Sequence, residues 1–203
     1  MTSRKDLLSG QSAEGSERSG RPERADAARN RAKVLAAAGA LFATRDPREV
    51  TMDDIAKAAG VGRGTLYRRY PDTAAIAQAL LDEHERDLQE RLMRGAPPLG
   101  PGAPPAERLA AFYTAMVELL EGNSALALGA EPGRLRFAAG AYGFWRAHVR
   151  ALVAEAGVPD PDALVDVLLA PLAAEVYTHQ RDLGVPPERI AEALGRLARG
   201  VLA

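Results

Sequence analysis

The chain has 203 residues, of which 47% are hydrophobic and 26% are charged, enough apolar side chains for one large core or two small ones. It contains no cysteine, which excludes a disulfide framework and a thiolate metal site. No apolar run approaches the roughly 18 residues of a membrane span, and the polar N-terminus lacks a hydrophobic signal segment, so we expect a cytoplasmic protein with no membrane partner.

The net charge of −1 conceals a difference between the two parts of the chain. Residues 26–80 carry nine Lys and Arg against six Asp and Glu, a net of +3, whereas residues 81–203 carry twelve against seventeen, a net of −5. The basic front part favours an anionic partner, and the acidic back part favours a different one.

Residues 1–25 are rich in Ser, Gly, Arg and Glu and show no hydrophobic periodicity, so we expect a disordered N-terminal arm. Contact of this basic arm with a DNA groove stays open as an alternative. The next apolar residues predict a helix over about 27–45, ended by Asp46 and Pro47. They fall at helical spacing: Val34, Leu35, Ala38, Leu41 and Phe42.

Two short helices are predicted to follow. Thr51 caps the first, with Asp54 three residues later as a short capping box, and Gly60 ends it. The second helix is predicted over about 62–69, and Asp72 can cap the helix after it. Two short helices joined by a tight turn behind a supporting helix are typical of a helix-turn-helix unit, whose second helix enters the DNA major groove.

Glycines stand on both sides of Arg63, although a glycine inside a helix costs about 1 kcal/mol relative to alanine. The missing side chains let the backbone approach a phosphate or the groove floor, and Arg63 can reach a base edge, where its fork suits guanine. The hydroxyls of Thr65 and Tyr67 and the charges of Arg68 and Arg69 suit phosphates. On spacing alone, an ordinary solvated face explains these arginines equally well.

The rest of the chain predicts helices only, because no alternating strand pattern occurs in it. A Pro/Gly-rich linker occupies 95–106, the last two helices open with prolines, and Pro171 predicts a kink. His84 lies on an apolar stripe and is expected to pack between two domains. The expected helices run from the Asp72 cap to about Arg94, then from about 106, and over roughly 133–156, 161–183 and 187–202.

Three stretches resemble the N-terminal DNA-binding domain of TetR-family transcriptional regulators. They are RAKVLAAAGALFA at 31–43, VTMDDIAKAAGVGRGTLYRRYPD at 50–72, and the following helix to about Leu81. The resemblance covers about a quarter of the chain, and the remainder matches only in plan. It implies an all-α fold, with a helix-turn-helix domain over 26–72 and a helical effector-binding and dimerisation domain over 73–203.

Three positions depart from the family pattern. Gly62 stands where a Ser or Thr usually caps the recognition helix, which should loosen it by a few tenths of a kcal/mol. Thr73 stands where a Lys is usual, so the salt dependence of DNA binding should be shallower by about one ion. Asp46 and Pro47 replace a glycine after the first helix. The candidate DNA-binding residues are Thr51, Arg63, Gly64, Thr65, Tyr67, Arg68, Arg69 and Thr73.

The helix predicted over 161–183 carries apolar residues on more than one face, so it needs two packing partners, and the last helix carries a matching apolar stripe. Two such helices per subunit suit a four-helix interface in a homodimer, whereas completing the core of a monomer is the alternative. The candidate dimerisation residues are Leu164, Leu168, Leu172, Val176, Ile190, Leu194, Leu197 and Val201.

The segment RFAAGAYGFWRAH at 136–148 interleaves aromatic residues with glycines, a pattern that can leave a cavity between helices. Ordinary core aromatics are the alternative for any one of them. As a set they indicate a mainly apolar or aromatic ligand with a few polar anchors. The candidate ligand-binding residues are Phe112, Tyr113, Met116, Phe137, Tyr142, Trp145, Arg146, His148, Tyr177 and His179.

Glu175 and His179 have the i, i+4 spacing of a metal half-site, but the chain has only three histidines and no H-E-x-x-H, so we predict no metal and no cofactor. Without a nucleophile–base pair or a phosphate-binding glycine loop, we predict that the protein is not an enzyme. It is predicted to be a ligand-responsive repressor that binds palindromic operator DNA. An activator of the same fold, or a helical scaffold without specific DNA binding, are the alternatives.

Overall fold

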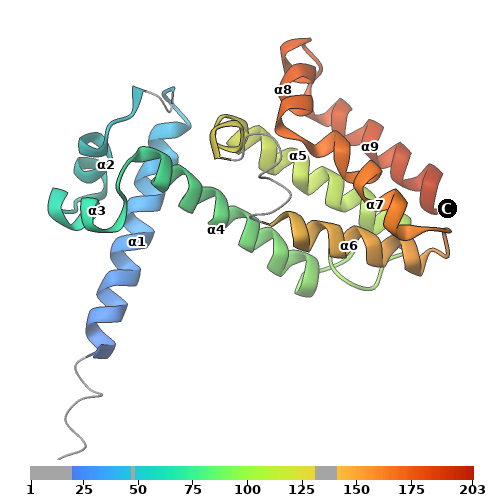
Figure 1. The fold of residues 1–203 in the computed structure, drawn as a ribbon, viewed down its shortest axis with the longest axis horizontal. Coiled ribbons are helices and arrows are strands. Elements are labelled where there is room, and N and C mark those ends of the chain that lie inside the picture. The colour runs from blue at the N-terminus through green and yellow to red at the C-terminus, as the bar shows by residue number, and fades with distance from the viewer. Residues whose placement is uncertain (1–19, 47–48, 131–140) are drawn as a thin grey trace, which may run out of the picture.

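The computed structural model describes residues 1–203 except 1–19, 47–48 and 131–140, and every regular element in the described part is a helix (Figure 1). This confirms the predicted all-α fold. The elements in chain order are α1 (Gly20–Phe42), α2 (Met52–Ala59), α3 (Arg63–Arg69), α4 (Thr73–Arg94), α5 (Pro105–Ala130), α6 (Tyr142–Glu155), α7 (Pro161–Leu169), the 3-10 turn η3 (Ala170–Leu172), α8 (Ala174–Asp182) and α9 (Pro187–Leu202).

Two separate hydrophobic cores form, one on each side of the molecule. The N-terminal core is built from α1, α2, α3 and the first half of α4, which contributes Ile76 and Leu80. The second half of α4 contributes Leu88 and Leu92 to the larger core, which α5 to α9 complete. One continuous helix therefore joins the two cores, as the ribbon in Figure 1 shows.

The helix ends of the N-terminal domain follow the predicted capping chemistry. The Thr51 hydroxyl accepts from the backbone N–H of Asp54, and the Asp54 carboxylate accepts from the backbone N–H of Thr51. Gly60 ends α2 in the left-handed region at φ 64°, a conformation that favours glycine. Asp72 caps α4 by accepting from the backbone N–H of Ala75. Short-range hydrogen bonds thus fix where each of these helices begins and ends.

The first helix is longer at its start than the apolar pattern indicated. α1 begins at Gly20 rather than near residue 27, and it ends at Phe42. Residues 26–29 are exposed and polar or small, so they carry no hydrophobic signal. Arg29 forms an ion pair with Asp26, three residues earlier on the same helix. Residues 1–19 of the expected arm lie outside the described part of the chain.

Pro171 breaks the helix predicted over 161–183 instead of kinking it. α7 ends at Leu169, η3 follows, and α8 begins at Ala174. Proline has no backbone N–H and its ring clashes with the preceding turn, so a continuous helix cannot pass through it. The predicted helix over 133–156 is observed as α6 from Tyr142, and its expected first turns lie outside the described residues.

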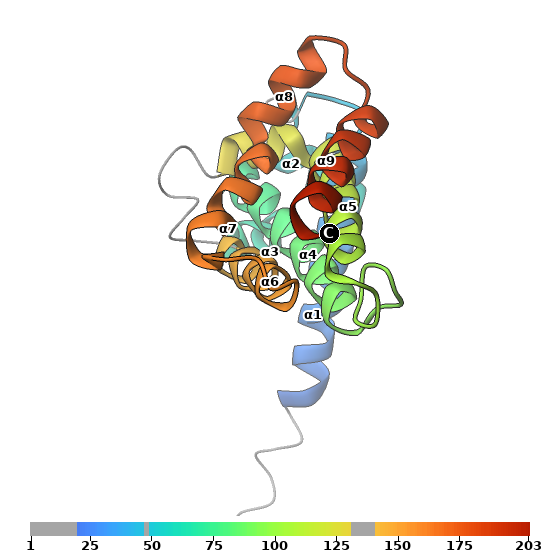
Figure 2. The ribbon, with the colours of Figure 1, turned by 90° about the vertical axis from the view of Figure 1, so that its right-hand side faces the viewer.

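α5 is the central helix of the larger domain. It packs against α4, α6, α8 and α9, and Figure 2 shows α9 beside it. The apolar stripe predicted on this helix is buried throughout: Leu109, Phe112, Tyr113, Met116, Val117 and Leu120. The Tyr113 hydroxyl donates to the backbone carbonyl of Leu168 at 2.9 Å, and the pKa of Tyr113 is raised by burial. Among the described helices, none is long and apolar enough to cross a membrane.

Candidate DNA-binding helix and ligand cavity

α3 is held to its domain by very few side chains. Leu66 is the only buried residue within the helix, and Tyr70, which follows α3, is buried as well and accepts a hydrogen bond from Arg31 at 3.3 Å. The remaining side chains of α3 are exposed, including 51% of Tyr67. A helix that buries one residue in seven presents nearly all of its surface to a partner.

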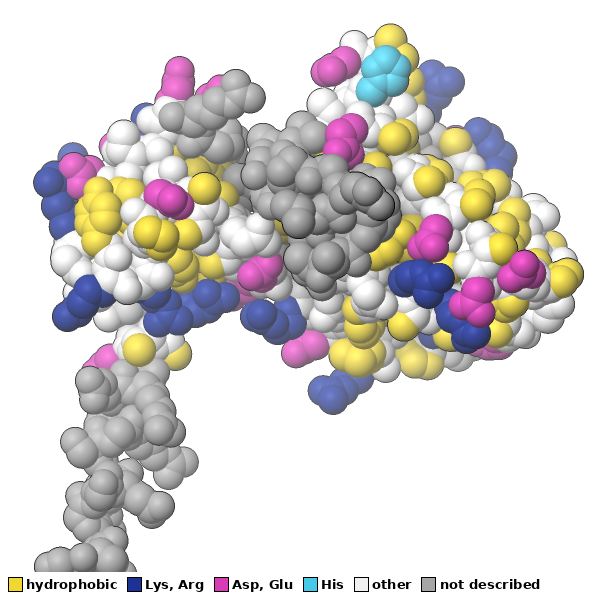
Figure 3. Space-filling model, in the orientation of Figure 1, with side chains coloured by type: hydrophobic (Ala, Val, Ile, Leu, Met, Phe, Trp, Pro, Cys, Tyr) yellow, Lys and Arg dark blue, Asp and Glu magenta, His cyan; other side chains and the backbone are white. Residues whose placement is uncertain are grey.

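The candidate DNA-binding residues on α3 share this exposed surface. Arg63, Thr65, Tyr67, Arg68 and Arg69 are all exposed, and Figure 3 shows Lys and Arg side chains along the outer and lower edges of this domain. Arg68 donates to the Thr65 hydroxyl at 3.4 Å, and the guanidinium of Arg63 forms an ion pair with Asp53 of α2. These groups have the chemistry for phosphate and base contacts.

The two glycines around Arg63 are not required by packing within the subunit. A Cβ atom added at Gly62 or Gly64 would meet nothing within 4 Å. Gly62 is the N-cap of α3 and supplies no side-chain hydrogen bond to it, as its sequence predicted. Their small size therefore has no internal explanation and suits close approach by an external molecule.

Thr51 and Thr73, the two threonines of the candidate set outside α3, occupy helix starts. Thr51 is exposed, but its hydroxyl is engaged with Asp54 in the capping box, which holds the pKa of the Asp54 carboxyl below its usual value. Thr73 is the first residue of α4 and is half-buried. Their use as phosphate contacts stays a prediction.

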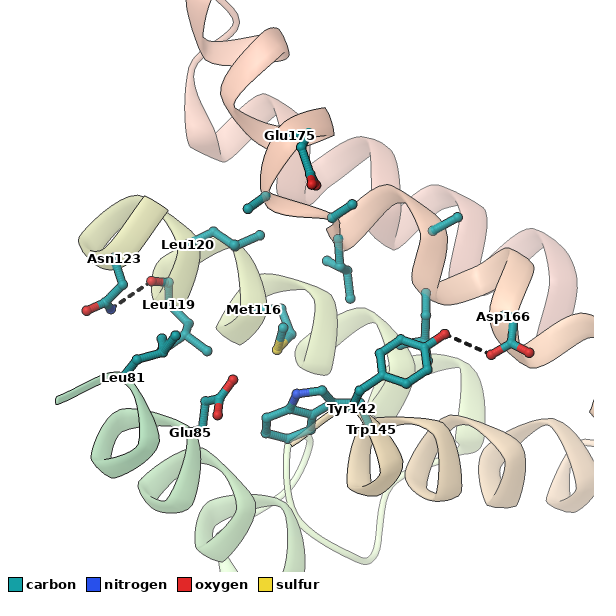
Figure 4. Close-up of a pocket in the computed structure, with 15 residues that line it drawn as sticks. Leu81, Glu85, Met116, Leu119, Leu120, Asn123, Tyr142, Trp145, Asp166 and Glu175 are labelled. Carbon is teal, nitrogen blue, oxygen red and sulfur yellow. Dashed lines mark hydrogen bonds between the residues drawn. The ribbon is translucent and has the colours of Figure 1, made fainter. Parts of the chain in front are cut away.

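A cavity of about 230 Å³ lies between α4, α5, α6 and the segment from α7 to α8 (Figure 4). Its walls are mostly apolar or aromatic, with four polar or acidic side chains among them. The lining residues are Leu81, Glu85, Met116, Leu119, Leu120, Asn123, Tyr142, Trp145, Asp166, Leu169, Ala170, Leu172, Ala173, Ala174 and Glu175.

Three of the ten candidate ligand-binding residues line this cavity: Met116, Tyr142 and Trp145. They approach it from α5 and α6 (Figure 4). The aromatic segment therefore does border a cavity, but only Tyr142 and Trp145 of it line the wall, together with Met116 of α5.

Six other candidates do not line the cavity, and the sequence prediction is corrected for them. Phe112, Tyr113 and Tyr177 are fully buried core residues, because their stripe positions face helix–helix contacts. His148 packs against Phe112, with ring centroids 5.4 Å apart, and His179 is exposed on α8. Arg146 binds Asp166, and Phe137 lies outside the described residues.

Asn123 is a cavity-lining residue that the sequence analysis missed. It is 7% exposed and is the only polar residue in the buried set of the described part. Its Nδ2 donates to the backbone carbonyl of Leu119 at 2.8 Å, so its Oδ1 is the acceptor that faces His84 Nδ1 at 3.0 Å. Because Glu121, Gly122 and Ser124 surround it in the sequence, no hydrophobic pattern marked Asn123 as a buried position.

The His84–Asn123 hydrogen bond joins α4 to the cavity wall. His84 is exposed, so the prediction that it packs between two domains is wrong. Leu81 and Glu85 of α4 line the cavity directly, and Ile76 and Leu80 of the same helix belong to the N-terminal core. The cavity and the helix-turn-helix unit are therefore connected through a single helix.

Two polar clusters fix the walls beside the cavity. Asp166 of α7 accepts from the Tyr142 hydroxyl at 2.8 Å and from Arg146 Nε at 3.2 Å. On the other side, Glu121 of α5 accepts from the Tyr177 hydroxyl and from Arg181 of α8. The hydrogen bond from Tyr177 lowers the pKa of the Glu121 carboxyl, and burial with this contact raises that of Tyr177.

The candidate dimerisation residues divide into two groups. Leu168, Leu172, Ile190 and Leu194 are buried in the core of their own subunit, so their assignment to a dimer surface is corrected. Val176 and Leu197 are 42% and 40% exposed, and Leu164 and Val201 are half-buried. Val167 and Leu183 are two further exposed apolar residues outside this candidate set.

No group of three His, Asp or Glu residues in the described part of the chain could hold a metal ion. Glu175 and His179, the predicted half-site spacing, are both exposed on α8. Glu175 lines the cavity, whereas His179 does not contribute to it.

Residues 34–80 match the family of bacterial regulatory proteins named for tetR. An uncharacterized HTH-type transcriptional regulator of Mycobacterium tuberculosis (strain CDC 1551 / Oshkosh) is 37% identical over 95 residues, 47% of this chain and 46% of that protein. The HTH-type regulator TtgR of Pseudomonas putida is 41% identical over 61 residues, 30% of this chain and 29% of that protein. The chain thus matches less than half the length of these relatives.

Solved structures share the arrangement over most of the chain. The fatty acid degradation regulator FadR from Bacillus halodurans aligns with a TM-score of 0.63 and 18% identity, covering 83% of this chain and 94% of that one. A protein from Rhodococcus sp. described as a TetR-family transcriptional regulator aligns with a TM-score of 0.62 and 18% identity, covering 86% and 99%. At this identity the likeness shows the fold alone.

The structure thus combines an N-terminal helix-turn-helix unit with a larger helical domain. Over residues 34–80 the chain is therefore similar to the DNA-binding domain of the tetR family.

The buried imidazole of His148 should make the protein less stable in acid. Burial, with Arg108 nearby, lowers the pKa of His148 to about 4, and no described group bonds its Nε2. A histidine in the unfolded chain takes up its proton near pH 6.5, so between about pH 6.5 and 4 the unfolded state binds more protons. The free energy of unfolding should therefore decrease as the pH is lowered through this range. Its slope against pH should correspond to the uptake of up to about one proton on unfolding.

Chemical denaturation of the wild type and of His148→Gln at a series of pH values measures this slope. The variant lacks the titrating group, so its curve should be flatter by the histidine's share while carboxylate contributions stay equal in both. Parallel curves for the two proteins would show that His148 titrates normally in the folded state.

Proposed function

We propose that the chain is a cytoplasmic, non-enzymatic transcriptional repressor that binds palindromic operator DNA as a homodimer and is released by a small-molecule effector. The observation that carries the proposal is the exposure of α3, which buries only Leu66 and offers its basic and hydroxyl side chains to solvent. A recognition helix needs this arrangement, because its side chains have to reach base edges and phosphates.

The division of labour on α3 follows from side-chain geometry. Arg63, at the first position of the helix, has the planar fork that pairs with guanine O6 and N7 in the major groove. Arg68 and Arg69 lie in the last turn and suit the phosphates that fix the register of the helix on the duplex. The open space around Gly62 and Gly64 permits the backbone of α3 to lie close to the groove.

Dimerisation is supported by the apolar side chains that the larger domain leaves exposed. Val176 of α8 and Leu197 of α9 are partly exposed, and the half-buried Val201 lies one turn beyond Leu197 on α9. A two-fold operator requires two reading helices held by a two-fold axis. The faces of α8 and α9 that carry these residues are the proposed interface.

The cavity is the proposed effector site. Its apolar and aromatic walls suit a ligand with a large hydrophobic part. Asn123 and the Tyr142 hydroxyl are candidate polar contacts for that ligand. The ionisable side chains among the described lining residues are Glu85, Asp166 and Glu175, so an anionic effector would need a cation from outside this set.

α4 is the proposed route from the effector to the DNA-binding helix, since it lines the cavity and also packs in the N-terminal core. An effector releases DNA only if it binds the released arrangement more tightly than the DNA-bound one. Moving a population from 1:99 to 99:1 requires a difference of about 5.5 kcal/mol. Tight binding without such a preference would leave DNA binding unchanged.

Selection of the purified protein against random duplex DNA at near-physiological salt should enrich an inverted repeat. Arg63→Ala should then lose discrimination at one base pair of each half-site by about 1–3 kcal/mol. Fluorescence anisotropy with the selected duplex and its single-base-pair variants measures both. Arg68→Ala is the control, expected to weaken all duplexes alike and to reduce the salt slope by about one. No enrichment would favour the scaffold alternative.

Leu197→Glu should convert the dimer to monomers, because it would bury an unpaired carboxylate between two apolar surfaces. Sedimentation velocity at micromolar concentration gives the oligomeric state directly. Met93→Glu makes the same chemical change at an exposed residue of α4 and should leave the dimer intact. A dimer that tolerates Leu197→Glu would place the interface away from this face of α9.

A neutral aromatic probe, N-phenyl-1-naphthylamine, should bind the cavity and quench Trp145, the only tryptophan of the chain. Ala174→Phe puts a ring at a lining position and should weaken probe binding at least about tenfold, a loss of 1.4 kcal/mol. Ala151→Phe, at an exposed position of α6, is the matched control. Equal binding by both variants would mean that the probe binds elsewhere.

A further inference from the structure

An exposed ion pair joins the two short helices of the helix-turn-helix unit. An Nη atom of Arg63 on α3 lies 2.6 Å from Oδ2 of Asp53 on α2, with the two side chains 71% and 48% exposed. Exposed pairs of this kind contribute little to stability, because water screens them and both side chains lose freedom. The stability gained from the ion pair itself therefore does not explain why Arg63 is paired with a carboxylate.

Attraction to DNA does not explain it either. Asp53 lies next to the arginine at the start of the proposed recognition helix, where a carboxylate repels the phosphates of any duplex that approaches. A surface selected only for affinity would carry a neutral or basic residue there. Asp53 reduces attraction to the DNA backbone in general, so any benefit of Asp53 to DNA binding has to lie in which DNA is bound.

Asp53 itself is held firmly. It lies in the first turn of α2, two residues after the Thr51 cap, and the neighbouring Asp54 closes the capping box and pairs with Arg45. The position of the carboxylate is therefore set by the start of the helix. The left-handed turn at Gly60 then brings α3 back against α2.

Arg63 has no such support from its own helix. Its neighbours Gly62 and Gly64 have no side chains, and among the described residues its guanidinium pairs with Asp53 of α2. A free arginine loses rotamer entropy on binding, and a pre-formed pair removes part of that loss before DNA arrives. One nitrogen pairs with Asp53, and the other guanidinium donors stay available to a base edge.

We propose that Asp53 is a positioning residue for sequence recognition, which holds the Arg63 guanidinium toward base edges and away from phosphates. The inference rests on the proposed DNA-binding function of α3 and adds a discriminating role for an acidic residue of α2. Asp53 lowers affinity for unrelated DNA and raises the ratio between operator and unrelated DNA.

Asp53→Asn keeps the shape of the side chain and removes its charge. Affinity for an unrelated duplex should rise about three- to tenfold, with a salt slope steeper by about 0.9, the value for one additional phosphate contact. Affinity for the operator should change less, so discrimination at the base pair read by Arg63 should fall about three- to tenfold. Asp53→Glu restores a carboxylate and should recover part of that discrimination.

The same substitution in an Arg63→Ala background separates positioning from plain repulsion. If Asp53 acts through Arg63, Asp53→Asn should leave discrimination at that base pair unchanged once Arg63 is absent. Asp87→Asn, which removes an exposed carboxylate from α4, is the charge control and should change neither background. Circular dichroism of each variant verifies that the comparison is between folded proteins.

An equal tightening of operator and unrelated DNA by Asp53→Asn in both backgrounds would overturn the proposal, because Asp53 would then only repel phosphates. No change with any duplex would overturn it as well, leaving Asp53 a favourable charge at a helix start. A wild-type protein without sequence preference is a different result, since that is failure of the proposed function itself.

Discussion

The packing of α4 into two hydrophobic cores is the constraint on which the rest of this molecule depends. Ile76 and Leu80 complete the core beneath the helix-turn-helix unit, and Leu88 and Leu92 belong to the core of the larger domain. Because a helix is stiff along its axis, a shift at one end of α4 cannot be absorbed between the two cores. The cavity borders the same helix, so occupancy of the cavity and the placement of α3 share one mechanical element.

The helix-turn-helix unit and the larger domain differ in where they place their polar and charged side chains. α3 buries little and is held by Leu66 and Tyr70, which leaves its chemistry on the outside, where α2 contributes Asp53 to it. The larger domain hides its chemistry among helices, where Tyr177 and Arg181 tie α8 to Glu121 of α5. One end suits a large charged partner that comes to a surface, and the other suits a small hydrophobic molecule that is enclosed.

The break at Pro171 shapes the enclosed end. Since proline stops α7 and lets α8 begin in a new direction, the residues around the break, Ala170, Ala173 and Ala174, become one wall of the cavity. Small side chains at a helix break leave space that a continuous helix would fill with larger residues on a regular stripe. The Tyr142–Asp166 hydrogen bond then fixes α7 against α6 on the same side.

The sequence by itself determined the all-α class, the helix caps at Thr51, Gly60 and Asp72, and the two short helices of the helix-turn-helix unit, because capping boxes, glycine stops and 3.6-residue periodicity act within a few residues of the chain. It therefore also identified the exposed arginines of α3. It did not determine which apolar residues are buried in the core of the subunit and which stay exposed. Leu168 and Leu197 both belong to apolar stripes of their helices, yet of these two only Leu197 is exposed to solvent. Those differences, like the cavity contacts of Asn123 and the pairing of Asp53 with Arg63, depend on how helices distant in the chain meet, and only the tertiary structure decided them.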